Sequence, residues 1–263
     1  AWNCSYIPEV LLDTDKCFGV RLRAPNCTNP DMATYYMTNR SCPYSKSILE
    51  RAFEGGYNFI DAQLGTETCA GTCRFQEHLA ELPDLIQNEK FFVTFTDVPF
   101  KKNENSIEHF AATLQKHVLD ELHEHFGIDT SDEALRATIE AHNEICDIIT
   151  QIGEFRKLDK PTITGTEFHI INLVSMVCPK YLILPYLRET LEDLKTREAD
   201  AKPNYRVKVV LAGSENDDPD FTKLIESCGA LVVADRYCYG SLPGREKIEI
   251  RKGETALRAV ARH

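Results

Sequence analysis

Short apolar runs rich in β-branched and aromatic residues recur along the chain, with helical spacing between them. The runs lie at Phe18–Arg23, Tyr57–Asp61, Phe91–Thr96, Val207–Leu211 and Ala230–Ala234. Several of them are apolar throughout, which is typical of strands that are covered on both faces. Segments such as Ser45–Glu54 and Asp220–Ser227 show the helical pattern. This alternation predicts an α/β fold with parallel sheets.

The middle of the chain has a different pattern, which is helical and charged from about Ile107 to Phe155. It is interrupted near Gly127, and a new helix is predicted after Ser131, where acidic residues occupy the first turn. A further helix is expected at about Tyr181–Glu198, and Pro161–Gly165 has the composition of a linker. The long helices are therefore expected to separate two α/β units.

The chain length fits this division, because 263 residues exceed a typical single domain. We predict an N-terminal α/β domain at 1–105, a helical connection at 106–160 and a C-terminal α/β domain at 161–263. The final stretch, Gly253–His263, is still apolar-periodic without a stop signal, and the chain begins without methionine or a leader. We therefore expect a fragment whose C-terminal domain is truncated.

Composition narrows the classes of partner. The net charge is -11, so the basic surface that nucleic acids or anionic membranes attract is missing. No apolar run approaches the ~18 residues of a membrane-spanning helix. Ten cysteines without a secretory signal are typical of reduced thiols. We expect a cytoplasmic protein with no nucleic-acid and no membrane partner.

The ten cysteines fall into two groups by local context. Cys146, Cys178 and Cys228 occupy apolar helical positions or helix ends, and we expect them to be small core residues. The other seven are Cys4, Cys17, Cys27, Cys42, Cys69, Cys73 and Cys238. Among these, Cys69 and Cys238 come after predicted strands and Cys42 precedes a predicted helix. Ligands collect at the carboxyl ends of parallel strands, so these cysteines can converge on one site.

The spacing of Cys69 and Cys73 leaves several kinds of site open. Structural zinc usually needs a second such pair, which the chain lacks. A radical-SAM cluster would need a third cysteine where Gln76 stands. A disulfide is awkward within a helix and disfavoured in the cytosol. An iron-sulfur cluster accepts thiolates from distant loops and is the favoured interpretation. Outside the cysteines, His169 follows the linker and is a candidate acid/base residue.

Seven groups of stretches, in order along the chain, carry a resemblance to a known family. They are Cys4–Glu9 with Val20–Leu22, Ser41–Ser47, Phe59–Asp61 leading to Glu67–Cys69, Asp132–Arg136 with Asn143–Glu144, Val209–Gly213, Ile225–Ala230 and Asp235–Gly240. Together they resemble the superfamily of 2-hydroxyacyl-CoA dehydratases and benzoyl-CoA reductases, which includes the double-cubane cluster proteins. The resemblance implies two Rossmann-like domains with parallel sheets, a helical connection, and a cysteine-bound cluster between the domains.

The resemblance also implies individual ligands. Cys42 and Cys69 match family cluster ligands, Cys238 matches a cysteine that only some branches have, and Cys4 and Cys27 look like the additional cysteines of the double-cubane branch. The chain departs from the family at Ala70, where an aspartate is common, and at Cys73, where a cysteine is unusual. With Cys17 assigned to packing, six candidate ligands remain: Cys4, Cys27, Cys42, Cys69, Cys73 and Cys238. Two cubanes joined by one sulfide need six thiolates, whereas a single [4Fe-4S] cluster needs three or four.

The function implied by this resemblance is an iron-sulfur reductase, or a subunit of one, that reduces a small molecule at a double-cubane [8Fe-9S] cluster. An ATP-hydrolysing activator protein would supply its low-potential electrons. The alternative within the superfamily is the [4Fe-4S] subunit of a 2-hydroxyacyl-CoA dehydratase or benzoyl-CoA reductase, which acts on an acyl-CoA. A non-catalytic α/β scaffold with structural cysteines is the alternative from another class. By analogy, we expect a homodimer or a heterodimer with a related subunit.

Overall fold

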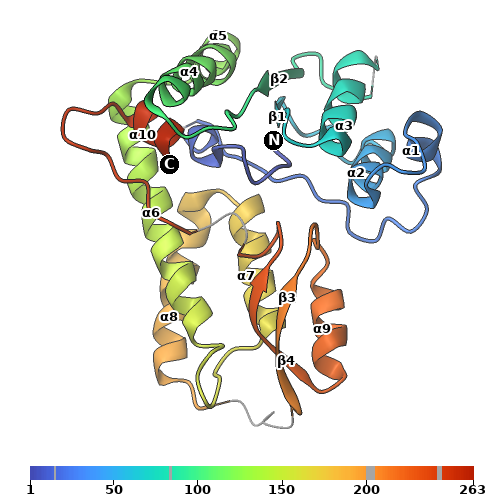
Figure 1. Cartoon of the computed structure of the whole chain (residues 1–263), viewed down its shortest axis with the longest axis vertical. Helices are drawn as coiled ribbons and strands as arrows, with labels where there is room; N and C mark the ends of the chain where they lie inside the picture. Colours follow the sequence, from blue (N-terminus) through green and yellow to red (C-terminus); the bar gives the residue numbers. More distant parts are fainter. Residues whose placement is uncertain (15, 83–84, 200–204, 242–244) are drawn as a thin grey trace. The chain divides into compact units, whose positions relative to one another are not determined.

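The computed structural model describes residues 1–14, 16–82, 85–199, 205–241 and 245–263, which form two compact units (Figure 1). Unit 1 comprises Ala1–Thr138 and Ile248–His263, and unit 2 comprises Ile139–Lys247. Both units contain parallel strands and helices, so the predicted α/β class is confirmed. The domain boundaries predicted at residues 105 and 160 stay predictions. In the described part of the chain, no helix is both long and apolar enough to cross a membrane.

Unit 1 is built around two parallel strands and the helices that follow them. Its elements are η1 (Glu9–Leu12), α1 (Asp31–Tyr36), α2 (Pro43–Phe53), β1 (Ala62–Thr66), α3 (Ala70–Glu81), β2 (Phe92–Thr96), α4 (Glu104–Leu114), η2 (Gln115–Leu119), α5 (Asp120–Phe126), α10 (Ala256–Arg262) and the start of α6 (Asp132–Glu154). Strands β1 and β2 pair in parallel from Ala62 opposite Phe92 to Thr66 opposite Thr96. Helix α3 packs against this sheet and against α2 (Figure 1).

Two extended segments continue the parallel arrangement beside β1. The Leu64 backbone N–H donates to the Ala1 carbonyl at 2.9 Å, so residues 1–3 lie along β1. On their other side, the Trp2 N–H donates to the Val20 carbonyl at 3.0 Å and the Leu22 N–H donates to the Trp2 carbonyl at 2.8 Å. Trp2 forms parallel bridges with both Arg21 and Leu64. Residues 20–22, residues 1–3 and β1 therefore run side by side in the same direction.

Two of the predicted strands in unit 1 are wrong. The run Phe18–Arg23 makes only an isolated bridge at Arg21, because its neighbour, residues 1–3, is too short to form a ladder. The run Tyr57–Asp61 lies in turns, where the Ile60 N–H donates to the Tyr57 carbonyl at 3.1 Å, and the strand starts one residue later at Ala62. The predicted strand at Phe91–Thr96 is confirmed as β2.

Unit 2 combines a parallel pair of strands with long amphipathic helices. Its elements are the remainder of α6, α7 (Gly165–Val177), α8 (Lys180–Thr196), β3 (Val207–Ala212), α9 (Pro219–Ser227) and β4 (Ala230–Arg236). Strands β3 and β4 pair in parallel, with a register shift between Val209 and Val210. Both correspond to predicted strands, and α8 and α9 correspond to predicted helices.

The core of unit 2 lies between α6, α7 and α8. Buried apolar side chains at helical spacing come together there, including Ile145, Ile149 and Ile152 from α6, Phe168 from α7 and Leu187 from α8. Helices α7 and α9 pack against each other and against β4. The loops after β3 and β4 are thereby left at the carboxyl edge of the sheet, where α/β proteins place ligands.

Candidate metal centre

The parallel arrangement of unit 1 brings two predicted ligands to one edge of the sheet. Cys4 directly follows residues 1–3, Cys27 comes after residues 20–22 and the turn at Ala24, and Cys69 follows β1. Because these segments run in the same direction, their carboxyl ends lie at the same edge. The sheet therefore directs Cys4 and Cys69 toward one side of the unit, while the turn at Ala24 separates Cys27 from residues 20–22.

Two of the predicted ligands stand at the starts of helices. Cys42 is the N-cap residue of α2, directly before Pro43, and Cys69 is the N-cap residue of α3. Neither helix start receives a hydrogen bond from a capping side chain. The N-terminal N–H groups of a helix carry partial positive charge, which favours a thiolate close to them. Both cysteines thus stand beside the positive end of a helix dipole.

Close packing of α2 on α3 brings these two helix starts together. A Cβ atom placed on Gly71 would lie 3.2 Å from the Cys42 Cβ atom and 2.9 Å from the Ser45 Oγ atom. The second residue of α3 therefore needs to be glycine for Cys42 to approach the first turn of α3. On the other side of Cys69, the Thr68 Oγ1 atom is 3.4 Å from the Cys4 Sγ atom. These contacts link the segments that carry Cys4, Cys42 and Cys69.

Cys73 lies one turn further along α3. Its backbone N–H donates to the Cys69 carbonyl at 2.9 Å, and its thiol lies 3.5 Å from the Thr66 carbonyl oxygen at the end of β1. Burial raises the pKa of the Cys73 thiol above its ordinary value. We call the region formed by Cys4, Cys42, Cys69 and Cys73 the cysteine corner.

The donor set of the cysteine corner suits an iron-sulfur cluster. Its sulfurs come from separate segments, a pattern that such clusters accept and that differs from paired zinc knuckles. A buried hydroxyl, that of Ser45, faces the corner and has no hydrogen-bond partner among the described residues. Across the described residues, no three Cys, His, Asp or Glu side chains are close enough to hold one metal ion. The four cysteines share one corner of the unit, while the assignment of each as a ligand stays a prediction.

The remaining predicted site residues, Cys238 and His169, lie in unit 2. The Cys238 backbone N–H donates to the Ser214 carbonyl at 3.1 Å, which places Cys238 at the carboxyl edge of β3 and β4. The His169 ring is buried, and its Nε2 atom is 3.1 Å from the Asn216 carbonyl. Because a carbonyl only accepts, Nε2 of a neutral ring donates there, and Nδ1 accepts from the Thr222 hydroxyl at 2.9 Å. The roles of Cys238 and His169 stay predictions.

Two of the three cysteines that were expected to be core residues lie in the core or pack against it. Cys146 is buried in α6, and Cys178 packs against the apolar core of unit 2. The expectation for Cys228 is wrong, because this residue is exposed at the C-terminus of α9. Its carbonyl accepts a hydrogen bond from Arg206 Nη2 at 2.9 Å, so its backbone rather than its side chain has a structural role.

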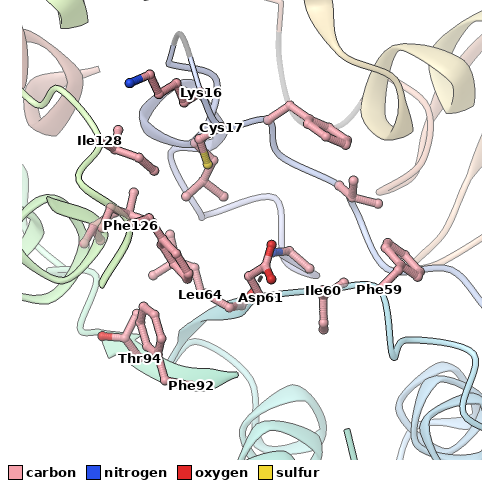
Figure 2. Close-up of a pocket in the computed structure, with 17 residues that line it drawn as sticks. Lys16, Cys17, Phe59, Ile60, Asp61, Leu64, Phe92, Thr94, Phe126 and Ile128 are labelled. Carbon is pink, nitrogen blue, oxygen red and sulfur yellow. Dashed lines mark hydrogen bonds between the residues drawn. The ribbon is translucent and has the colours of Figure 1, made fainter. Parts of the chain in front are cut away.

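An apolar cavity of about 210 Å³ lies elsewhere in unit 1 (Figure 2). It covers the face of the sheet formed by Leu64, Phe92 and Thr94, and Phe126 of α5 closes part of it. Cys17 lines this cavity, and burial raises the pKa of its thiol to about 11. None of the six predicted ligands lines it. The position of Cys17 in an apolar wall fits the packing role expected for it.

Ser45 and Gly71 are the residues at this centre that were missed from the sequence. Gly71 carried a usable signal, because a glycine in the first turn of a helix is unfavourable by about 1 kcal/mol relative to alanine and calls for a packing reason. Ser45 carried none, since serine near a helix start is ordinary. Only the contact between α2 and α3 shows that its hydroxyl faces Gly71.

Comparison with known proteins identifies the family of this chain. The chain matches the family described as 2-hydroxyglutaryl-CoA dehydratase, D-component, over residues 4–263. No curated protein matches it in sequence. The matched region begins at Cys4 and includes every cysteine of the cysteine corner. Because the match spans nearly the whole chain, this protein belongs to the 2-hydroxyglutaryl-CoA dehydratase D-component family.

Proposed function

We propose that the cysteine corner holds an iron-sulfur cluster and that the chain is the cluster-bearing subunit of a reductase. Membership of the family makes the chain a dehydratase-type or reductase-type subunit of the 2-hydroxyacyl-CoA dehydratase class. The observation that supports the cluster most strongly is the parallel arrangement of residues 20–22, residues 1–3 and β1. Residues 1–3 lead directly to Cys4, and β1 leads to Cys69 at the same sheet edge.

The cysteines of the cysteine corner differ in how they would bind the cluster. Cys42 and Cys69 bind iron as thiolates beside the starts of α2 and α3. In the double-cubane form, Cys4 and Cys73 add ligands from the neighbouring segments. When bound, the cluster supplies one-electron transfer at low potential. The protein controls water access and the hydrogen bonds that reach the sulfurs.

Six candidate thiolates favour the double-cubane [8Fe-9S] form, with Cys27 and Cys238 as the remaining ligands. The reaction would then be the reduction of a small molecule with electrons from an ATP-hydrolysing activator. A single [4Fe-4S] cluster in an acyl-CoA dehydratase or benzoyl-CoA reductase subunit is the second candidate. Membership of the dehydratase family supports the subunit class of this candidate. We further propose a second copy of the chain or a related subunit as partner. We also propose a cytoplasmic location, because all ten cysteines are free thiols.

Iron stoichiometry separates the two candidates. The full chain would be purified without oxygen, and iron and acid-labile sulfide would be measured per chain for the unmodified protein and for Cys4→Ser and Cys73→Ser. The double cubane predicts about eight irons, with losses in both variants, whereas a single cluster predicts about four irons that neither change affects. Cys228→Ser is the matched control, because this exposed cysteine lies in unit 2.

A further inference from the structure

Asn3 and Gln76 form a fully buried pair of amides between residues 1–3 and α3. The Gln76 Nε2 atom donates to the Asn3 Oδ1 atom at 3.0 Å, and both side chains are completely buried. Their other amide atoms, Asn3 Nδ2 and Gln76 Oε1, have no hydrogen-bond partner among the described residues. Buried polar atoms without partners destabilise a fold, and an apolar pair of the same shape avoids this loss. Stability alone therefore gives no reason for amides at these two positions.

Two of the predicted ligands are sequence neighbours of this pair. Asn3 directly precedes Cys4, and Gln76 follows Cys73 by three residues on α3, so Gln76 and Cys73 lie on the same side of this helix. Strand β1 makes room for the amide, because a Cβ atom on Gly65 would overlap the Gln76 side chain. The hydrogen bond between Asn3 and Gln76 thus joins the segment that carries Cys4 to the part of α3 that carries Cys73.

The two thiols themselves lie against the same short stretch at the end of β1, residues 66–68. The Cys4 Sγ atom is 3.4 Å from the Thr68 Oγ1 atom, and the Cys73 Sγ atom is 3.5 Å from the Thr66 carbonyl oxygen. The hydroxyl oxygens of Thr66 and Thr68 are 2.9 Å apart. The position of Cys4 relative to Cys73 is therefore set on one side by this stretch and on the other by the amide pair.

Arg21 holds the backbone on both sides of Cys4. Its Nη2 atom is 3.4 Å from the Asn3 carbonyl oxygen and 3.2 Å from the Ser5 Oγ atom. A guanidinium only donates, so Arg21 is the donor in both contacts. The buried Arg21 side chain is fixed in turn by the Trp2 ring, whose centroid lies 4.7 Å from the guanidinium carbon. The Cys4 segment is thereby held rigid enough for one hydrogen bond to α3 to place it.

We propose that Gln76 is a positioning residue that, through Asn3, holds the Cys4 thiol beside the Cys73 thiol so that the two act as one pair. The inference rests on the proposed function, in which Cys4 and Cys73 are ligands that the double-cubane form adds. A hydrogen bond between amides is directional and fixes one relative position, whereas apolar side chains can slide past each other. This specificity accounts for a buried amide pair that leaves two of its atoms unsatisfied.

The experiment measures how readily the two thiols can be bridged in the iron-free full chain. Dibromobimane, a short reagent that joins two neighbouring thiols, is added without oxygen, and peptide mass spectrometry quantifies the bridged peptides that contain Cys4 and Cys73. Gln76→Met removes the amide and keeps the length of the side chain. For this variant we expect about a tenfold slower bridging, because the Asn3 amide loses its buried partner and the Cys4 segment is released.

Gln63→Met is the matched control. Gln63 is equally buried, and its Nε2 atom donates within β1, to the Leu64 carbonyl at 2.9 Å. This change should leave the bridging rate unaltered. A double variant, Asn3→Leu with Gln76→Met, separates position from stability, because apolar groups replace both amides. Its unfolding temperature should be no lower than that of Gln63→Met, while bridging should stay as slow as in Gln76→Met.

Three results would overturn the inference. The first is an unmodified chain in which Cys4 and Cys73 are not bridged, and the second is equal bridging rates in Gln76→Met and Gln63→Met. The third is a double variant that recovers the bridging rate of the unmodified chain, since packing rather than the hydrogen bond would then set the position of Cys4. The proposed function fails separately, if the anaerobically purified chain binds no iron, because bridging is measured without iron.

Discussion

The Arg156 side chain donates a hydrogen bond of 2.7 Å to the Asp235 carboxylate, and both side chains are buried within unit 2. The guanidinium also lies over the Phe168 ring, with its central carbon 3.6 Å from the ring centroid. The second Asp235 oxygen accepts from the Ser241 backbone N–H at 2.7 Å. This pair joins the end of α6 to the carboxyl end of β4, next to the loop that carries Cys238.

We predict that Asp235→Asn lowers the free energy of unfolding by about 3–5 kcal/mol, because it leaves the buried Arg156 charge uncompensated. The measurement is urea-induced unfolding of the iron-free chain, followed by circular dichroism. Glu144→Gln is the control, because Glu144 forms an exposed ion pair with Arg188 and its removal should cost at most about 1 kcal/mol. Equal losses in the two variants would contradict the role assigned to the buried pair.

The Glu254 carboxylate predicts a pH dependence of the stability of unit 1. Hydrogen bonds from Arg262, from the Arg251 backbone N–H and from Arg258 lower the pKa of Glu254 to about 2. The ionised carboxylate therefore stabilises the folded state fully above pH 4.5, and this contribution is lost as the pH falls toward 2.

Glu254→Gln tests this relationship. At pH 7 we expect a loss of about 1–2 kcal/mol of unfolding free energy, allowing for screening by solvent. Between pH 4.5 and 2.5 the difference from the unmodified protein should shrink, as measured by chemical unfolding at several pH values. Glu246→Gln, at an exposed position, should show no such trend. A constant difference across this range would refute the assignment of the pH dependence to Glu254.

Thiol reactivity should separate Cys17 from the exposed cysteines. A rise in its pKa from 9.0 to about 11 reduces the thiolate fraction at pH 8 about 100-fold, and only the thiolate is nucleophilic. Alkylation of the iron-free protein by iodoacetamide, followed by peptide mass spectrometry, should therefore modify Cys17 more slowly than the exposed Cys228, by up to about 100-fold. Comparable rates would show that the apolar cavity does not shield the Cys17 thiol.

Much of the fold was predictable because most of its strands are short apolar runs that the local sequence shows. The apolar runs at β2, β3 and β4 and the long helices of the middle region were found from periodicity alone. The predicted strand at Phe18–Arg23 failed because its pairing depends on residues 1–3, a segment too short to show alternation. The apolar run at Tyr57–Asp61 follows Gly55, whose φ of 74° belongs to a turn that apolar periodicity does not reveal.

The candidate site was predictable only in part, because its members meet through tertiary packing. The position of Cys69 after a strand was visible, and the rule on carboxyl ends pointed to a ligand. The approach of Cys42 to α3 depends on the missing side chain of Gly71, which no local pattern reports. The exposure of Cys228 was missed because helix ends look alike in sequence whether or not they are covered.

The central claim is that the cysteine corner binds an iron-sulfur cluster through Cys42 and Cys69. The most direct test is the iron and acid-labile sulfide content of the anaerobically purified full chain, compared with Cys42→Ser, Cys69→Ser and the control Cys228→Ser. We predict about four to eight irons with matching sulfide in the unmodified protein and in Cys228→Ser, and at most about half of this in the two corner variants. A folded, colourless protein without iron, or equal iron in all four proteins, would contradict the claim.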